Sequence, residues 1–458
     1  MTTAAPAATA PAAPSARRRL WQRVLLALAV LFVLLGAVLF WLLGTQSGLN
    51  YALSLAAPMV EAVEAQGTLA SGFRAERIDV TDEQMRVSIQ SPVLVWRLSA
   101  LLAGRVHIQT LEAARITFAS APSEEETPPR TEPLALPKVA LPVSLQLERL
   151  HIGEIALQDW ASGEETALVR ELTARASSDG RQHRIETLTA AIVPIDGQLA
   201  LEATADTAAQ PYTATAHGTL TGTLPGAEEG KTHALAARLD AEGSLDALPL
   251  QLAATVDETA RVQLEATLNA LLPMPLMQAH MQAQEINPAQ FAASAPAARL
   301  DAELQVQQTE TPPEQPWQLT GTLALNNAAS GTLDKQQLPL ESLSTALVLA
   351  AEAVRLDDLR ILLRGEGRIT GRLGWQADAN RAGLMQADIT LANLHPQALD
   401  ATLPAATLAG RIEAQGTPAT QSARVQLATG KAQLHLDGEY HADDARFAAQ
   451  GALKAVNP

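Results

Sequence analysis

This 458-residue chain has no cysteine, few aromatic residues and an excess of negative charge, and these features limit the kinds of site and core that it can form. There is no cysteine, so neither a disulfide framework nor a cysteine-based zinc site can form. Aromatic residues make up only 3% of a chain that is 47% hydrophobic, so Ala, Leu, Val and Ile carry the apolar mass and few large rings are available for a core. The formal net charge is −16, which excludes nucleic acid as an expected partner because phosphate binding needs clustered Lys and Arg.

Motifs that carry catalysis are also missing. No H-E-x-x-H, H-x-x-E-H or G-x-S-x-G pattern occurs. The stretch GAEEGKT, Gly226 to Thr232, is too short for a phosphate-binding loop and places glutamates where phosphates would sit, so a turn is predicted. Asp357–Asp358 and Asp443–Asp444 are predicted to be turn or surface charges, because adjacent strand residues point to opposite faces. We therefore expect no catalytic, cofactor-binding or metal-binding residues and no enzyme, with an exported hydrolase as a distant alternative.

A transmembrane helix is predicted near the N-terminus. The residues from Val24 to Leu43 include no charged or strongly polar side chain, and as a helix they would rise about 30 Å, the thickness of a bilayer's hydrocarbon core. Basic residues cluster only before this run, so the N-terminus is expected in the cytoplasm and the bulk of the chain outside it. The alternative, a cleaved signal peptide, has a shorter apolar region. The expected membrane-interface residues are Arg17, Arg18, Arg19, Trp21, Arg23 and Trp41.

Composition sets further boundaries along the chain. Residues 1–16 form an Ala/Pro tail that cannot build a core, and 17–44 contain the membrane anchor. Apolar residues at helical spacing predict an amphipathic helix within 45–60, at the outer membrane surface. Residues 120–137 and Gln307–Pro316 are rich in Pro and Glu and are predicted to be flexible.

Beyond residue 60 the hydrophobic period becomes two. In RVQLEATL, Arg261 to Leu268, and KAQLHLDG, Lys431 to Gly438, apolar and polar side chains alternate. LTGTLALN, Leu319 to Asn326, and TATAHGTLTGTL, Thr213 to Leu224, follow the same pattern. Breaks that contain Gly and Asp separate such stretches, which predicts a mainly β protein built of antiparallel strands.

The apolar strand face has two possible interpretations. It could be the aliphatic core of a closed sandwich or β-helix, or an uncovered trough that acyl chains complete, since each buried methylene contributes about 0.8 kcal/mol. The periodicity favours neither. The candidate residues lining a lipid groove are Val262, Leu264, Leu268, Leu323, Leu325, Val425, Leu427, Leu434 and Leu436.

An internal repeat is visible in the second half. The stretch that begins AQEINPAQF at Ala283 resembles LANLHPQAL at Leu391, and the terminal LKAVNP resembles the start of both. Repetition of short β units indicates an array that grows by adding strands. The sequence is therefore expected to be the N-terminal part of a longer chain.

Several stretches resemble the TamB family, the inner-membrane half of the translocation and assembly module, within the AsmA-like group. The motifs cover the first third of the chain, and the rest is similar only as a pattern. The stretches are GTQSGL from Gly44, GTLASGFRAERIDV from Gly67, VLVWRLSALLAGRVHIQTLEAARITF from Val93 and LALPKVALPVSLQLERLHIGEIAL from Leu134.

The resemblance implies an anchor in the inner membrane and a long, open β-groove, a half-pipe or β-taco, in the periplasm. It divides the exported part into an AsmA-like β unit at 61–119 and a repetitive groove at 138–458, without the family's C-terminal domain. The implied function is movement of phospholipid toward the outer membrane and support of outer-membrane protein assembly and secretion, with phospholipid acyl chains and a TamA-type outer-membrane barrel as partners. A second hypothesis is a non-lipid scaffold that presents strand edges to outer-membrane proteins by β-augmentation.

Overall fold

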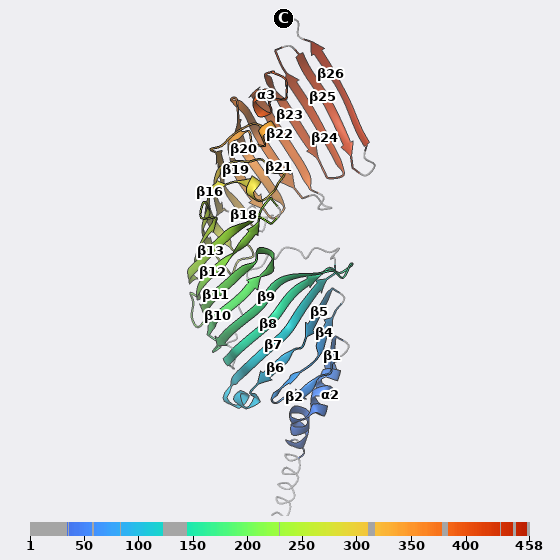
Figure 1. The fold of residues 1–458 in the computed structure, drawn as a ribbon, viewed down its shortest axis with the longest axis vertical. Helices are drawn as coiled ribbons and strands as arrows, with labels where there is room; N and C mark the ends of the chain where they lie inside the picture. The colour runs from blue at the N-terminus through green and yellow to red at the C-terminus, as the bar shows by residue number, and fades with distance from the viewer. Residues whose placement is uncertain are drawn as a thin grey trace, which may run out of the picture. The chain divides into compact units, whose positions relative to one another are not determined.

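The chain forms strands along most of its length in a computed structural model that describes residues 34, 36–56, 59–82, 84–121, 144–228, 230–309, 317–377, 383–430, 432–442 and 446–455. These residues contain 26 strands with only short helices between them, which confirms the mainly β class (Figure 1). The chain divides into two compact units. Unit 1 comprises Met1–Pro122 and Leu147–Thr166, and unit 2 comprises Ser123–Gln146 and Ala167–Pro458.

Unit 1 is an antiparallel meander in which each strand before β7 is interrupted once, while β7 and β8 are continuous. Two ladders, β1–β4–β5 and β2–β3–β6, both end on β7, which pairs with β6 through its first half and with β5 through its second half. Its elements are α2 (Gln46–Ala56), β1 (Val60–Val63), β2 (Gln66–Thr68), β3 (Gly72–Arg74), β4 (Arg77–Thr81), β5 (Met85–Gln90), β6 (Val93–Trp96), the 3₁₀ helix η1 (Leu98–Ala103), β7 (Arg105–Ser120) and most of β8 (Ser144–Gln158).

The interruptions of neighbouring strands in unit 1 lie beside one another and form a line across the sheet. Glu64 and Ser91 adopt left-handed φ angles of 51° and 49° between the two halves of their strands. A backbone hydrogen bond from Ala75 N to Pro92 O, at 3.1 Å, joins two of these interruptions. Gly153 of β8 lies so close to β7 that a Cβ atom would be 2.6 Å from the carbonyl oxygen of Ala114. Left-handed residues therefore lie at the interruptions of the first strands, and a glycine permits the close approach of β7 and β8.

The predicted membrane anchor falls mostly outside the described residues. Leu34 and residues 36–44 are helical and are followed by α2, which lies within the range predicted for the amphipathic helix. No helix among the residues that the structure describes is long and apolar enough to cross a membrane. Of the predicted interface residues only Trp41 is described, and it is exposed; Arg17, Arg18, Arg19, Trp21 and Arg23 are outside the described part.

Unit 2 is an uninterrupted antiparallel meander. Every strand from β9 to β26 pairs with the next strand in the chain, so at a spacing of about 4.8 Å the sheet extends about 80 Å across its strands (Figure 1). The strands are β9 (Glu165–Ser178), β10 (Gln182–Ile192), β11 (Gly197–Asp206), β12 (Thr213–Pro225), β13 (Thr232–Ser244), β14 (Leu248–Val256), β15 (Ala260–Leu268), β16 (Leu276–Ile286), β17 (Leu300–Gln308), β18 (Gln318–Asn327), β19 (Leu340–Ala350), β20 (Ala353–Leu363), β21 (Gly367–Gln376), β22 (Leu384–Leu394), β23 (Leu408–Gly416), β24 (Thr420–Ala428), β25 (Ala432–His441) and β26 (Arg446–Ala455).

The four stretches with period two all form strands, namely β15, β25, β18 and β12, and GAEEGKT forms the turn between β12 and β13. Asp357–Asp358 lies inside β20, where Asp358 is exposed and the Asp357 side chain is 42% exposed, so the pair forms surface charges rather than a turn. One prediction needs correction, because strand β17 extends to Gln308, two residues into a segment predicted to be flexible. Most of the predicted insertion at 120–137 and the pair Asp443–Asp444 lie outside the described residues.

The sequence repeat corresponds to a structural repeat. The penultimate residues of strands β16 and β22, Glu285 and Asn393, are both left-handed and lie at a β-bulge. Each is followed by a short helix that begins with proline, η3 (Pro288–Gln290) or α3 (Pro396–Leu399), and then by the next strand. The same bulge and helix thus recur six strands apart.

The short helices all lie on one side of the unit 2 sheet. In a meander, the connections that follow even-numbered strands share one margin, here called the even margin, and the others form the odd margin. The even margin holds η2 (Val193–Ile195), η3, η4 (Leu333–Lys335) and α3. Its loops hydrogen-bond to one another, from Ala227 N to Gln290 O and from Ala401 N to Asp334 Oδ1. The loops of the even margin are therefore joined to one another by hydrogen bonds.

Candidate functional site

Alternating apolar residues in unit 2 combine into continuous rows across the sheet. Residues directly opposite each other in neighbouring strands lie on the same face, so the strand register defines which side chains form a row. One row has an apolar residue or glycine in every strand from β10 to β26. This row, the long row, consists of Ala190, Leu199, Leu220, Ala237, Ala254, Val262, Ala283, Ala302, Leu325, Leu343, Ile361, Ile369, Leu391, Gly410, Leu427, Leu434 and Leu453.

Two further rows run beside the long row on the same face. The middle row passes through Leu188, Leu264 and Leu323 and reaches Thr345, its only polar member between β9 and β19. The third row runs from Ala176 in β9 to Ala449 in β26 through apolar residues and glycines alone. The apolar face is therefore three rows wide across unit 2.

The residues proposed from sequence all fall on this face. Val262, Leu325, Leu427 and Leu434 belong to the long row; Leu264 and Leu323 belong to the middle row. Val425 and Leu436 oppose each other in β24 and β25, and Leu268 opposes Leu248. Each of the nine side chains is half-buried, while the alternating residues Gln263, Glu265, Gln433 and His435 are exposed.

No second layer covers the apolar face within the described part of unit 2. Among all described residues, the only large side chains that are fully buried are Leu49 in unit 1 and Leu319 in unit 2. A closed sandwich of this size would bury many more large side chains between its two sheets. The half-buried state of the rows comes from neighbours on the same face.

A β-bulge keeps the apolar side chains of β20 on one face. Leu356 and Leu359 are three residues apart, which in a regular strand would place them on opposite faces. The register shifts between them, and Asp358 has a left-handed φ of 52°. As a result Leu356 opposes Leu373 in the third row and Leu359 opposes Gly371, whose neighbours continue the apolar face.

Three exposed aromatic side chains and one methionine border the apolar face on the odd margin. Trp375, Met385, Tyr440 and Phe447 lie at the ends of β21, β22, β25 and β26, where these strands meet that margin. They line a cavity of about 550 Å³ on the apolar face, and Phe447 is 68% exposed. In a chain with so few aromatic residues, sequence reasoning missed this cluster because its members are spread over many residues.

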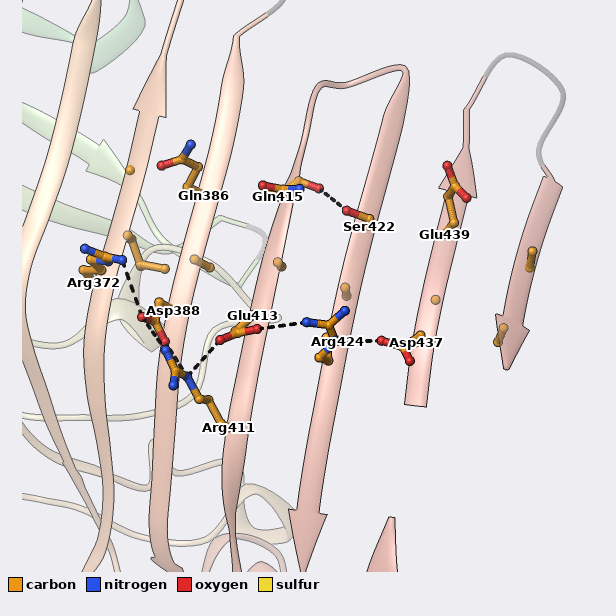
Figure 2. Close-up of a pocket in the computed structure, with 18 of the residues that line it drawn as sticks. Arg372, Gln386, Asp388, Arg411, Glu413, Gln415, Ser422, Arg424, Asp437 and Glu439 are labelled. Atoms are coloured by element: carbon orange, nitrogen blue, oxygen red, sulfur yellow. Dashed lines mark hydrogen bonds and ion pairs between the residues drawn. The ribbon is translucent and has the colours of Figure 1, made fainter. Parts of the chain in front are cut away.

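The opposite face of the same strands carries a charged ladder. Arg372, Asp388, Glu413, Arg424 and Asp437 are successive cross-strand partners in β21 to β25 (Figure 2). Ion pairs of 2.9 to 3.6 Å join each arginine of this series to its acidic partners, and Arg411 bridges the like-charged neighbours Asp388 and Glu413. A one-residue slip in register would move these charges to the apolar face, so the ladder helps to specify the register.

Hydrogen bonds within this polar face lower the pKa of its carboxyl groups. The Arg411 guanidinium holds the pKa of Asp388 below its usual value, and Arg424 does the same for Asp437. In β13, the hydrogen bond from Arg238, assisted by His217, lowers the pKa of Asp240 to about 2. These carboxyl groups stay ionised at neutral pH, and their charge favours exposure of the polar face to water.

Metal-binding clusters are lacking in the described part of the chain. No cluster of three or more His, Asp or Glu side chains there could hold a metal ion. The buried His233 uses both ring nitrogens, Nδ1 with Asp257 Oδ2 at 2.5 Å and Nε2 with the Gln290 carbonyl oxygen at 3.1 Å. It therefore joins loops of the even margin and offers no ligand position.

The fold and the site together define a class: an antiparallel β-sheet protein with one continuous aliphatic face that no second layer covers in the described part of unit 2, and one charged face. The family model described as TamB, N-terminal domain, matches residues 34–158 and 121–457. The chain belongs to the TamB family, which confirms the resemblance seen in its sequence. No curated protein and no solved structure matches it.

Proposed function

We propose that this protein is an inner-membrane-anchored periplasmic bridge that conducts phospholipid toward the outer membrane and supports outer-membrane protein assembly and secretion. Membership of the TamB family supports the general role. The observation that carries the lipid part is the long row, which has an apolar residue or glycine in every strand from β10 to β26.

The energetics suit acyl chains. Removing one methylene from water contributes about 0.8 kcal/mol, so a chain of about sixteen carbons gains on the order of 10 kcal/mol by lying on such a face. Because neighbouring strands present similar Leu, Ala, Val and Ile side chains, an acyl chain finds nearly the same environment at each step. A uniform surface of this kind favours movement along the sheet over tight binding at one place.

The two margins of the face suit a lipid with its headgroup at one side. The hydrogen-bonded loops of the even margin border the apolar face on one side. On the odd margin, Trp375 and Tyr440 each combine an apolar ring with a polar hydrogen-bonding atom, which suits the boundary between acyl chains and headgroups. The polar headgroup would then face water while the chains contact the rows.

The membrane anchor and the barrel partner in this proposal are taken from the TamB family. The anchor would be the apolar run Val24–Leu43 with a cytoplasmic N-terminus, and the partner would be an outer-membrane barrel of the TamA type. A non-lipid scaffold that presents strand edges to outer-membrane proteins is the competing function, and it predicts no lipid on the apolar face.

A double substitution tests the proposal in cells. Leu264→Asp together with Leu434→Asp places two carboxylates in the apolar rows, and we expect delivery of newly made phospholipid to the outer membrane to fall while the protein remains abundant. The matched control is Gln263→Asp with Gln433→Asp, which adds the same charge on the opposite face. Normal delivery by the first variant, or equal loss in both variants, would contradict the proposal. Loss of the protein itself would indicate a closed core.

A further inference from the structure

Helix α2 has an exposed apolar edge that its own unit does not cover. The helix carries no charged residue, and it attaches to unit 1 through Leu49, which is fully buried. On the other side Tyr51 is 49% and Leu55 69% exposed, and Met59 beyond the helix is 56% exposed. Large apolar side chains at this exposure are not part of the core.

The exposed side of α2 is itself divided into two edges. At 100° per residue, Tyr51 and Leu55 lie next to each other on one edge. Ser47, Asn50 and Ser54 lie on the other edge and are also exposed. The helix therefore has a core strip, an apolar edge and a polar edge, which is the pattern of a helix that lies in a membrane interface.

The apolar edge continues the surface of the preceding helix. Leu34, Val38, Leu39 and Phe40 are exposed there. Trp41, the last exposed residue of that helix, has its ring 5.7 Å from the ring of Tyr51, so the two surfaces meet at an aromatic pair. Trp and Tyr are enriched at the boundary between membrane and water.

The bend between the two helices is held by defined contacts. A Cβ atom on Gly48 would be 2.3 Å from the carbonyl oxygens of Trp41 and Leu42, so only glycine fits at this point. Thr45 Oγ1 donates to Trp41 O at 2.6 Å and accepts from Gly48 N at 3.1 Å. These residues belong to the GTQSGL stretch, which thus forms an elbow.

The elbow is also tied to the first strands of unit 1. Gln46 Nε2 donates to Ala65 O at 2.6 Å, and Gln46 Oε1 accepts from Gly67 N at 2.7 Å. Ala70 N donates to Leu43 O at 2.7 Å. The preceding helix, α2 and the β1–β3 segment are therefore held in one arrangement.

We propose that Tyr51 and Leu55 insert into the outer interface of the bilayer that the preceding helix enters. The occupant is lipid rather than protein because the edge is uncharged, meets the aromatic pair and continues an exposed apolar helix whose sequence upstream is a charge-free apolar run. The proposal rests on the membrane anchor of the proposed function. It adds a second contact, which would set the tilt of the first strands relative to the membrane.

Site-directed fluorescence tests this contact on the full chain. The protein has no native cysteine, so Leu55→Cys, Ser54→Cys and Leu39→Cys can each carry a single environment-sensitive fluorophore after reconstitution into phosphatidylcholine vesicles. The quencher is a phospholipid with a nitroxide near its headgroup. Leu39 reports insertion of the preceding helix, and Ser54, on the polar edge, is the matched control for Leu55.

The proposal expects the label at position 55 to lose most of its fluorescence and shift to the blue, as at position 39, while the label at 54 changes little. Quenching at 39 with none at 55 would overturn the α2 contact and leave the anchor intact. Quenching at neither 39 nor 55 would overturn the anchor and with it this proposal. Equal quenching at 54 and 55 would show general adsorption and would also overturn the defined edge.

Discussion

Thr345 Oγ1 donates a hydrogen bond to the backbone carbonyl oxygen of Asp357, 2.9 Å away in the neighbouring strand. Thr345 is only 5% exposed and is the sole polar side chain in its stretch of the middle row. Its partner lies at the bulge of β20, where Asp358 has a left-handed φ angle. The hydroxyl thus links β19 to the bulge of β20 from within the apolar face, and it also lies 3.1 Å from the carbonyl oxygen of Ala346 in its own strand.

We therefore expect Thr345→Val to weaken this part of the sheet although it makes the row more apolar. Removing the hydroxyl leaves the part-buried Asp357 carbonyl without this donor, which costs about 1 to 3 kcal/mol. Amide hydrogen exchange in β19 and β20 should then speed up roughly 5- to 150-fold, without a similar change in distant strands. Thr390→Val, at an exposed position of β22, is the control. Unchanged exchange in β19 and β20 would mean that the hydroxyl contributes nothing to the bulge.

A second prediction concerns Gly321 in β18. A Cβ atom at this position would be 1.8 Å from the carbonyl oxygen of Gln305 in β17, whereas a Cβ atom at Gly374 would have no neighbour closer than Arg355 Cγ at 4.0 Å. Gly321→Ala should force β17 and β18 apart and destabilise them by about 1 to 3 kcal/mol. Gly374→Ala should leave stability nearly unchanged. Hydrogen exchange of β17 and β18 measures the difference, and equal behaviour of the two variants would contradict the close approach.

A third prediction follows from the lowered pKa of Asp240, which is about 2 against an ordinary value of 3.8. Because the folded-state pKa is lower, the ionised form stabilises the fold above about pH 4, and this contribution is lost as the pH falls through about 2. The first cause is Arg238 Nε, 2.6 Å from Asp240 Oδ2. In Arg238→Gln the titration midpoint of Asp240 should rise toward 3.8, with a smaller rise in His217→Gln. Nuclear magnetic resonance of labelled aspartate would show this, and a midpoint near 3.8 in the unmodified protein would refute it.

The strands and their apolar face are predictable from sequence because both depend on local alternation. RVQLEATL and KAQLHLDG show the period of two directly, and the nine residues chosen from such stretches lie on one face. Turn chemistry also predicts the GAEEGKT turn. These features need no knowledge of which strand pairs with which.

Features that depend on register could not be predicted. The bulge at Asp358 uses a left-handed acidic residue where glycine would be the usual signal, so the spacing of Leu356 and Leu359 gave no indication of a shared face. The aromatic border unites Trp375 and Phe447, which are brought to one margin only by the pairing of the strands between them. The continuity of the apolar rows likewise depends on the register of each pair of neighbouring strands, which the sequence does not show.

The central claim, that lipid covers the apolar face, is tested most directly by photo-crosslinking in cells. A photoreactive residue is placed at Leu434 of the long row and, in a separate variant, at Gln433, its exposed neighbour on the opposite face. The account predicts attached phospholipid at position 434 and none at 433. Absence of lipid at both positions, in a protein that is folded and abundant, would contradict the account and favour a scaffold whose apolar face is covered by protein.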